Sequence, residues 1–197
     1  MVIRGVAPPA GAKPHTVLAP VQAPADPSAS EDFFHLLSTL DGDFVLGELR
    51  ADAAAFSLTF GERRVAPGAY IPVIQAGNAP TVQATQDGVF TWVLLDIDAT
   101  NAPFLHAITS NIQSGTTDNQ VAVVSYFPVL PSSGAHRYVS LLFKQQEVAP
   151  RDHFSGHEEE FQARRPTFDV SAYAQREQLD FVAYSYFYST PAQPTEL

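Results

Sequence analysis

Hydrophobic and β-branched residues recur in short runs between residues 55 and 145, and turn-forming residues separate the runs. Valine, isoleucine, phenylalanine, tyrosine and threonine dominate each run, a composition that is typical of strands. The predicted strands are AFSLTF (55–60), GAYIPVI (68–74), GVFTWVLLD (88–96), LHAITSNI (105–112), QVAVVSYF (120–127) and HRYVSLLFKQ (136–145). Breaks such as APG, AGNAP, QDG and PSSG are too short for helical crossovers between most of them. The pattern therefore predicts an antiparallel sandwich or a barrel-like sheet.

Helical periodicity marks three other segments. Apolar residues at helical intervals follow an acidic first turn and predict a docked helix over 31–40. Ser155 and Glu158 form a capping-box pattern at the start of GHEEEFQARR, which predicts a helix that ends before Pro166. The segment SAYAQREQL predicts a last helix that ends near Leu179.

The chain then alternates again in FVAYSYFYS (181–189), which predicts a terminal strand. The alternation puts Tyr184, Tyr186 and Tyr188 on one face and Phe181, Ala183 and Phe187 on the other. We expect this strand to be packed against the body of the protein rather than to line a ligand channel.

The first 29 residues contain six prolines among small residues. Because proline has no backbone N–H and a fixed φ, this segment predicts an extended arm. A chain of 197 residues otherwise fits one domain, which we expect over 30–197.

The charge balance narrows the range of partners. The formal net charge is −10, and the 11 basic residues form no stripe that could follow a phosphate backbone, so no nucleic acid partner is expected. No apolar run approaches the roughly 18 residues needed for a membrane span. The chain has no cysteine, which leaves the compartment open. Without a recognisable signal peptide the default expectation is cytoplasmic, and secretion is the alternative if a leader has been removed.

Two carboxylates end the most apolar predicted strand, in the segment DIDAT. Asp96 and Asp98 are two positions apart, so they are expected on the same side of the strand. Ionising one then opposes ionising the other, unless a histidine nearby carries a compensating charge. Taken singly, an aspartate after a strand is more often a turn residue than a functional one.

Histidines and a tyrosine occupy two neighbouring predicted strands. His106 lies in FLHAITSNI, and in GAHRY the side chains of His136 and Tyr138 share one face while Arg137 points to the other. A cleft that gathers these groups with the two aspartates contains proton donors, proton acceptors and a hydrogen-bond donor for an oxyanion.

The order and context of these motifs resemble the phosphatidylethanolamine-binding protein (PEBP) family, which includes kinase-inhibitor and plant flowering-signal branches. Members have a buried strand ending in Asp-Pro-Asp-x-Pro, a histidine in a strand that ends near Asn, a tyrosine before a proline-rich loop, and Gly-x-His-Arg-Tyr. The matching segments here are FTWVLLDIDAT, FLHAITSNI, YFPVLPSSGAHRY and FDVSAYAQREQLDFVAYSYF. The resemblance covers about residues 55–190, and Gly-x-His-Arg-Tyr is its most specific element.

The resemblance implies a mainly β fold with flanking helices, in which a large central antiparallel sheet packs on a smaller sheet and helices lie near the C-terminus. It also implies a small ligand pocket near the end of the sheet. The residues that match this pocket are Asp96, Asp98, His106, Tyr126, His136 and Tyr138. Arg137 matches an arginine that ties loops together, and we expect it to give structural support.

The chain also departs from the family pattern, which implies a divergent member. Ile97 and Thr100 stand where the family has prolines, and the loop before Gly134 lacks the usual glycines. Since prolines fix backbone shape and glycines allow close approach to an anion, the rim of the pocket is expected to be remodelled. Binding of phosphate or of a phospholipid headgroup is therefore not the expected property.

Three functions from different classes follow from this interpretation. The first is binding of a small anionic or carbonyl-bearing organic molecule in the Asp/His pocket. The second is an enzyme of a fungal natural-product pathway, for instance one that dimerises or cyclises maleic anhydrides, with His136, His106 and Asp96 transferring protons. The third is a kinase- or protease-inhibitor-like interaction module that uses the N-terminal arm and exposed loops.

No cofactor and no metal is expected. His153 and His157 are four residues apart and precede a run of glutamates, which resembles the metal-binding face of a helix. The capping-box pattern places His153 outside the helix, however, so the two imidazoles are not predicted to share one helical face.

Overall fold

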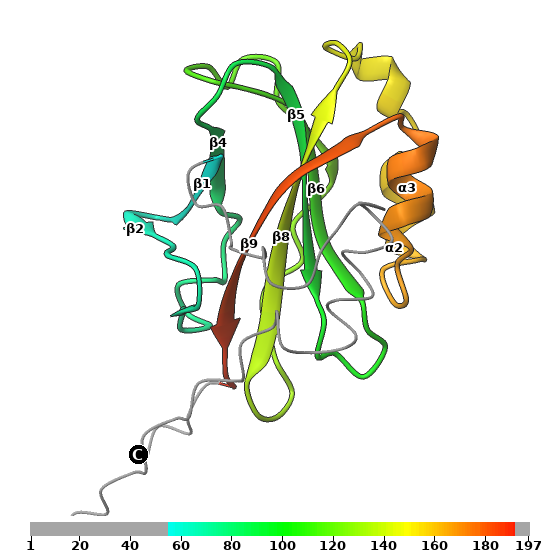
Figure 1. The fold of residues 1–197 in the computed structure, drawn as a ribbon. Coiled ribbons are helices and arrows are strands. Elements are labelled where there is room, and N and C mark those ends of the chain that lie inside the picture. Colours follow the sequence, from blue (N-terminus) through cyan, green and yellow to red (C-terminus); the bar gives the residue numbers. More distant parts are fainter. Residues whose placement is uncertain (1–54, 192–197) are drawn as a thin grey trace, which may run out of the picture.

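The computed structural model describes residues 55–191 (Figure 1), so the predicted arm over 1–29 and the predicted helix over 31–40 lie outside the described residues. The strands are β1 (Phe56–Phe60), β2 (Arg63–Arg64), β3 (Ala69–Tyr70), β4 (Thr81–Ala84), β5 (Val89–Asp96), β6 (Phe104–Gln113), β7 (Val121–Val124), β8 (His136–Gln145) and β9 (Asp180–Ser189). Between β8 and β9 lie the 3-10 helix η2 (Arg151–Phe154) and the helices α2 (His157–Gln162) and α3 (Val170–Arg176).

The strands form a large sheet and a small one, as expected. The large sheet has the order β3-β9-β8-β5-β6-β7, and the small sheet has the order β2-β1-β4. All pairs in both sheets are antiparallel except β3 with β9, which run parallel at the edge of the large sheet. The predicted strand over 68–74 is short because Pro72 lacks an N–H, and its carbonyl accepts from Gln75 and Ala76 to start a turn.

Both faces of the large sheet are covered (Figure 1). On one face Trp92 and Leu94 of β5 belong to the same apolar core as Phe56 and Leu58 of the small sheet. On the other face the apolar core includes residues of α2 and α3, among them Tyr173. Burial on both sides explains why β5 reads as a continuous apolar run rather than an alternating one.

The helices are shorter than the sequence predicts. Helix α2 has Gly156 at its N-cap, with φ of 83°, so the predicted capping box with Ser155 is wrong. Glu158 is engaged elsewhere, because its carboxylate accepts from the backbone N–H of Ser125 at 2.6 Å. Helix α3 ends at Arg176 instead of near Leu179. Gln178 has the left-handed φ of 53°, which stops the helix.

The terminal strand β9 is present, with one difference from the predicted alternation. A register shift between the pairs Leu142–Ala183 and Phe143–Phe181 marks an irregularity that interrupts the period of two. Phe181 therefore packs in the same core as Tyr184, on the helical side. Ala183 and Phe187 lie in the core toward the small sheet, as predicted.

Within residues 55–191 we find no helix that is long and apolar enough to cross a membrane.

Candidate functional site

The predicted site residues meet where β5 ends and β8 begins, at the lower end of the large sheet in Figure 1. Asp96 lies directly opposite Tyr138 on β8 and opposite Phe104 on β6. His136 shares a face with Tyr138 because it precedes it by two positions in the same strand. This face is the one that packs toward the small sheet, since Tyr138 belongs to that core.

Asp96 and His136 form a buried hydrogen-bonded pair. The Oδ2 atom of Asp96 lies 2.8 Å from Nδ1 of His136, and both residues are buried. The other carboxylate oxygen, Oδ1, accepts from the backbone N–H of Asp98 at 2.9 Å. Because a carboxylate only accepts, Nδ1 of His136 carries the hydrogen and Nε2 is the nitrogen left for a ligand.

His106 is aimed into the cluster by an irregularity in β6. Leu94 of β5 pairs with Ala107 and Leu95 pairs with Leu105, so His106 is the extra residue of a bulge. Its Nδ1 lies 2.7 Å from the carbonyl oxygen of Phe127 and must donate to it. Burial lowers the pKa of His106, and the Phe127 carbonyl and Asp96 offset this only in part. The ring is therefore neutral, with Nε2 as an acceptor.

The ring of Tyr138 lies next to the rings of both histidines. Its ring centroid lies 5.2 Å from that of His106, 6.5 Å from that of His136 and 5.1 Å from that of Phe187. Its hydroxyl is buried near Asp96 but makes no hydrogen bond of normal geometry to any residue within 55–191. Burial raises the pKa of Tyr138, and the negative charge of Asp96 raises it further. The phenol is thus a protonated donor at neutral pH.

Asp98 lies with Arg137 rather than with a histidine. The guanidinium donates to both carboxylate oxygens, at 2.7 Å from Nε and 2.6 Å from Nη2, and the backbone N–H of Arg137 donates to Oδ2 at 2.8 Å. The two carboxylates therefore have separate partners, which differs from the shared histidine charge expected from the sequence. The bidentate pair holds the segment after β5 against the start of β8.

Tyr126 borders the cluster, but its hydroxyl is occupied. It donates to the carbonyl oxygen of Ala76 at 2.6 Å and so holds the turn after β3. Burial raises the pKa of Tyr126, which keeps this donor protonated.

Three further residues belong to the site and were not singled out from the sequence. The rings of Phe104 and Phe127 lie 5.2 and 6.0 Å from the ring of His106 and supply apolar walls. Ser189 on β9 lies directly opposite His136 and has a buried hydroxyl without a hydrogen-bond partner within 55–191. Only strand pairing could have identified Ser189, because no local motif surrounds it.

The chemistry available is that of hydrogen bonding and proton transfer. Tyr138 donates, neutral His106 accepts, and His136 can do either through Nε2. Among the described residues there is no group of three or more His, Asp or Glu side chains that could hold a metal ion.

Comparison with known proteins agrees with this architecture. The sequence model of the phosphatidylethanolamine-binding protein family matches residues 47–187, which is more than half of the chain. The protein therefore belongs to the phosphatidylethanolamine-binding protein family, as a divergent member. Protein MOTHER of FT and TFL1 homolog 2 of Oryza sativa subsp. japonica is 27% identical over 154 residues, which are 68% of this chain and 82% of that protein.

Solved structures show the same fold at low sequence identity. The carboxypeptidase Y inhibitor, in complex with its cognate proteinase, superposes with a TM-score of 0.54 at 21% identity and covers 70% of this chain and 83% of its own. The phosphatidylethanolamine-binding protein from Plasmodium vivax gives a TM-score of 0.52 at 14% identity, over 70% of this chain and 85% of its own. At these identities the likeness concerns the fold alone.

Proposed function

We propose that the protein binds a small anionic or carbonyl-bearing organic molecule at the cluster of Asp96, His106, His136 and Tyr138. The observation that supports this most directly is the Tyr138 hydroxyl, a fully buried donor that makes no hydrogen bond of normal geometry within residues 55–191. Leaving such a group unpaired costs about 1–3 kcal/mol. A ligand oxygen that accepts from it recovers this cost on binding.

The charge of the cluster has different consequences for an anionic ligand and for a neutral carbonyl ligand. Asp98 is balanced by Arg137, so with neutral histidines the cluster has the single negative charge of Asp96. An anion would be repelled by that carboxylate, so its affinity should be lower than that of a matched neutral ligand. A neutral carbonyl needs only the Tyr138 hydroxyl.

Aromatic walls favour a ligand with an apolar part. Phe104 and Phe127 lie edge to face at 5.4 Å, and Phe187 stacks on Tyr138. Phenylpyruvate, which has a ring, a ketone and a carboxylate, and phenylacetone, which lacks the carboxylate, are therefore suitable probes.

Calorimetric titration with these two probes tests the proposal. We expect Tyr138→Phe to weaken binding of either probe about tenfold, because it removes one hydrogen bond. Tyr70→Phe removes a tyrosine hydroxyl on the edge strand β3 and should leave binding unchanged. Binding of neither probe by the wild-type protein, or equal binding by Tyr138→Phe, contradicts the proposal.

A second candidate is proton-transfer catalysis in the same site. The Asp96–His136 hydrogen bond favours it, because a carboxylate that holds Nδ1 leaves Nε2 of the imidazole as a base. Neutral His106 cannot donate to a developing oxyanion, so Tyr138 would do so. Such a site should accelerate exchange of the α-protons of phenylpyruvate in D₂O, measured by NMR. If His136→Gln catalyses the exchange at the wild-type rate, or if the wild-type protein gives no acceleration over buffer, catalysis at this site is contradicted and binding is the remaining function.

A third candidate is the inhibitor-like interaction module. The N-terminal arm lies outside the described residues, but the loop after β7 exposes Phe127 and Leu130, which are 43% and 67% accessible. One structural neighbour is a carboxypeptidase Y inhibitor in complex with its cognate proteinase. Inhibition of carboxypeptidase Y by the wild-type chain would favour this candidate. So would loss of that inhibition on deleting residues 1–29 or in Phe127→Ser/Leu130→Ser.

A further inference from the structure

A second group of buried polar side chains lies on the opposite face of the large sheet, near its upper end in Figure 1. Thr91 on β5, Ser110 on β6 and Gln145 on β8 are all at least nine-tenths buried. Together with Tyr173 of α3 and Glu177 they line a cavity of about 200 Å³. This is many times the roughly 10–15 Å³ that one water molecule requires. The cavity is distinct from the candidate site described above.

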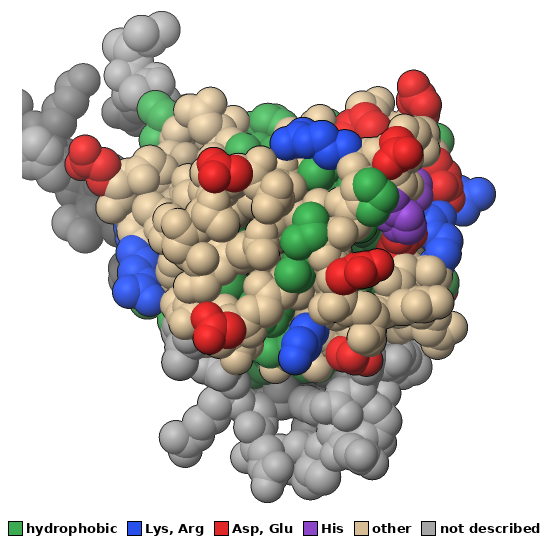
Figure 2. Space-filling model, turned by 90° about the horizontal axis from the view of Figure 1, so that it is seen from above, with side chains coloured by type: hydrophobic (Ala, Val, Ile, Leu, Met, Phe, Trp, Pro, Cys, Tyr) green, Lys and Arg blue, Asp and Glu red, His purple; other side chains and the backbone are tan. Residues whose placement is uncertain are grey.

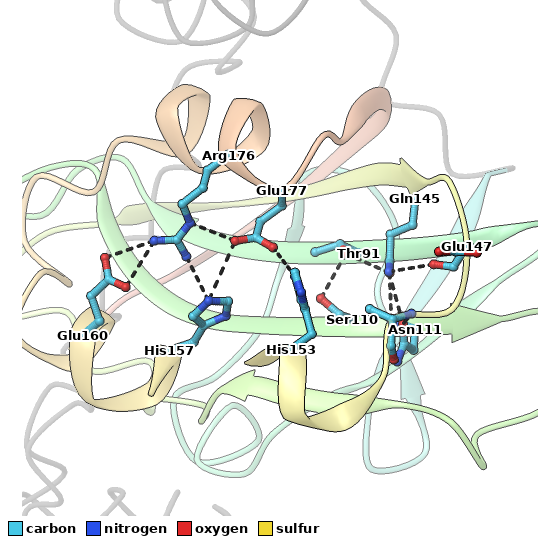
Figure 3. Close-up of polar contacts among 11 residues, drawn as sticks. Thr91, Ser110, Asn111, Gln145, Glu147, His153, His157, Glu160, Arg176 and Glu177 are labelled. Atoms are coloured by element: carbon cyan, nitrogen blue, oxygen red, sulfur yellow. Dashed lines mark hydrogen bonds and ion pairs between the residues drawn. The ribbon is translucent and has the colours of Figure 1, made fainter. Parts of the chain in front are cut away.

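Figure 3 shows the hydrogen bonds around this cavity, and the donor of each can be assigned from its chemistry. The backbone N–H of Asn111 donates to Oε1 of Gln145 at 2.8 Å, which identifies that atom as the amide oxygen. The Thr91 hydroxyl donates to the same oxygen at 2.9 Å. Its single hydrogen is then used, so the 3.0 Å contact with Ser110 takes its hydrogen from Ser110. Ser110 therefore presents only acceptor lone pairs to the cavity.

Tyr173 contributes a free donor to the same cavity. The residue is 3% exposed, and its hydroxyl has no hydrogen bond of normal geometry in the described part of the chain. Burial raises the pKa of Tyr173 and so does Glu177, whereas Ser110 and Arg176 offset this only in part. The hydroxyl stays protonated, so a donor and an acceptor lie near each other in the cavity wall.

Glu177 adds a second acceptor without adding an unbalanced charge. Its side chain is 7% exposed, and its oxygens accept from His153 and from Nε of Arg176, each at 2.8 Å. Burial would raise the pKa of Glu177, but the bonds to His153 and Arg176 outweigh it and lower the pKa, so the group is ionised. Each carboxylate oxygen has capacity for one more donor.

The surroundings favour an uncharged ligand. An anion would meet the Glu177 carboxylate, and a cation would find that carboxylate already paired with Arg176. Figure 2 looks onto this end of the molecule and shows histidine side chains beside both acidic and basic ones, so neither sign of charge dominates there. The apolar side chains of Phe154 and Leu179 also line the cavity.

We propose that this cavity binds a small neutral polyhydroxylated molecule. One ligand hydroxyl accepts from Tyr173 and donates to Ser110, and a second hydroxyl donates to Glu177. The carbon skeleton lies against Phe154 and Leu179.

An NMR titration of the ¹⁵N-labelled full chain with xylitol tests the proposal. We expect saturable shifts of the backbone amides of Ser110, Asn111, Tyr173 and Glu177, with an affinity in the millimolar range. Tyr173→Phe and Ser110→Ala should each weaken binding about tenfold, as expected for the loss of one hydrogen bond. Tyr70→Phe, which removes a tyrosine hydroxyl on the edge strand β3, should bind xylitol like the wild type.

Folding and binding can be separated in this experiment. Tyr173→Phe deletes a buried hydroxyl that has no partner in the described chain, so the unfolding midpoint without xylitol should be unchanged or higher. Shifts that grow linearly without saturation, or equal affinity of Tyr173→Phe and wild type, would overturn the proposal. So would a xylitol-soaked crystal that contains only ordered water between Tyr173 and Ser110.

Discussion

Asp96 holds the imidazole of His136 in one tautomer, because its Oδ2 atom lies 2.8 Å from Nδ1 on the neighbouring strand. In Asp96→Asn the amide oxygen can still accept from the N–H of Asp98, but the amide nitrogen then faces Nδ1 as a donor. We expect the proton of neutral His136 to move to Nε2, which ¹⁵N shifts of the imidazole report. The control Asp96→Ala should lose about 1–3 kcal/mol of stability for each donor left unpaired. An unchanged tautomer in Asp96→Asn would show that Asp96 does not set it.

The pair of Arg137 and Asp98 should stabilise the fold. Both side chains are mostly buried, with exposed fractions of 14% and 25%, and the guanidinium binds both carboxylate oxygens. We expect Arg137→Lys to lose about 1–2 kcal/mol in the free energy of unfolding, since an ammonium cannot replace the bidentate contact. Urea denaturation measures this. Arg64→Lys on the exposed strand β2 serves as control, and an equal effect of both substitutions would contradict the prediction.

His106 should make the protein less stable in mild acid. Burial lowers its pKa below the ordinary 6.5, so the unfolded chain binds the proton more readily than the folded one. Stability from this group is complete above about pH 6.5 and is lost as the pH falls through the lowered folded value. We expect His106→Gln to lose less stability than wild type between about pH 7.5 and about pH 5.5 in urea denaturation.

The control for this prediction is His157→Gln. Burial also lowers the pKa of His157, so His157→Gln should reduce the pH dependence of the unfolding free energy independently of His106. If His106→Gln keeps the full wild-type slope, His106 is not held neutral by the fold.

A glycine at position 178 should stabilise helix α3. Gln178 has the left-handed φ of 53°, a conformation that is costly for residues with a Cβ and free for glycine. We expect Gln178→Gly to raise the free energy of unfolding by about 0.5–1 kcal/mol. Gln175→Gly, one turn earlier in α3, should lower it by about 1 kcal/mol, and thermal unfolding compares the two. A loss of stability in Gln178→Gly would contradict this account.

The sequence by itself determined the features that depend on local pattern. The strands β5, β6 and β8 follow from runs of apolar and β-branched residues, and the spacing in GAHRY put His136 and Tyr138 on one face. The order of the motifs identified the family, which the match over residues 47–187 confirms. These signals are local because the strand's own backbone makes successive side chains point to opposite faces of the sheet.

The tertiary structure alone decided the contacts between distant segments. The parallel pairing of β3 with β9, the bulge that turns His106 inward and the irregularity that moves Phe181 to the helical side depend on register between strands. The capping box predicted at Ser155 is absent because Glu158 instead accepts from the backbone N–H of Ser125, in the loop after β7. The pairing of Asp98 with Arg137 and the position of Ser189 beside His136 also depend on contacts between strands that are distant in the sequence. Such contacts form only when the chain is folded, since no residue within a few positions of either partner specifies them.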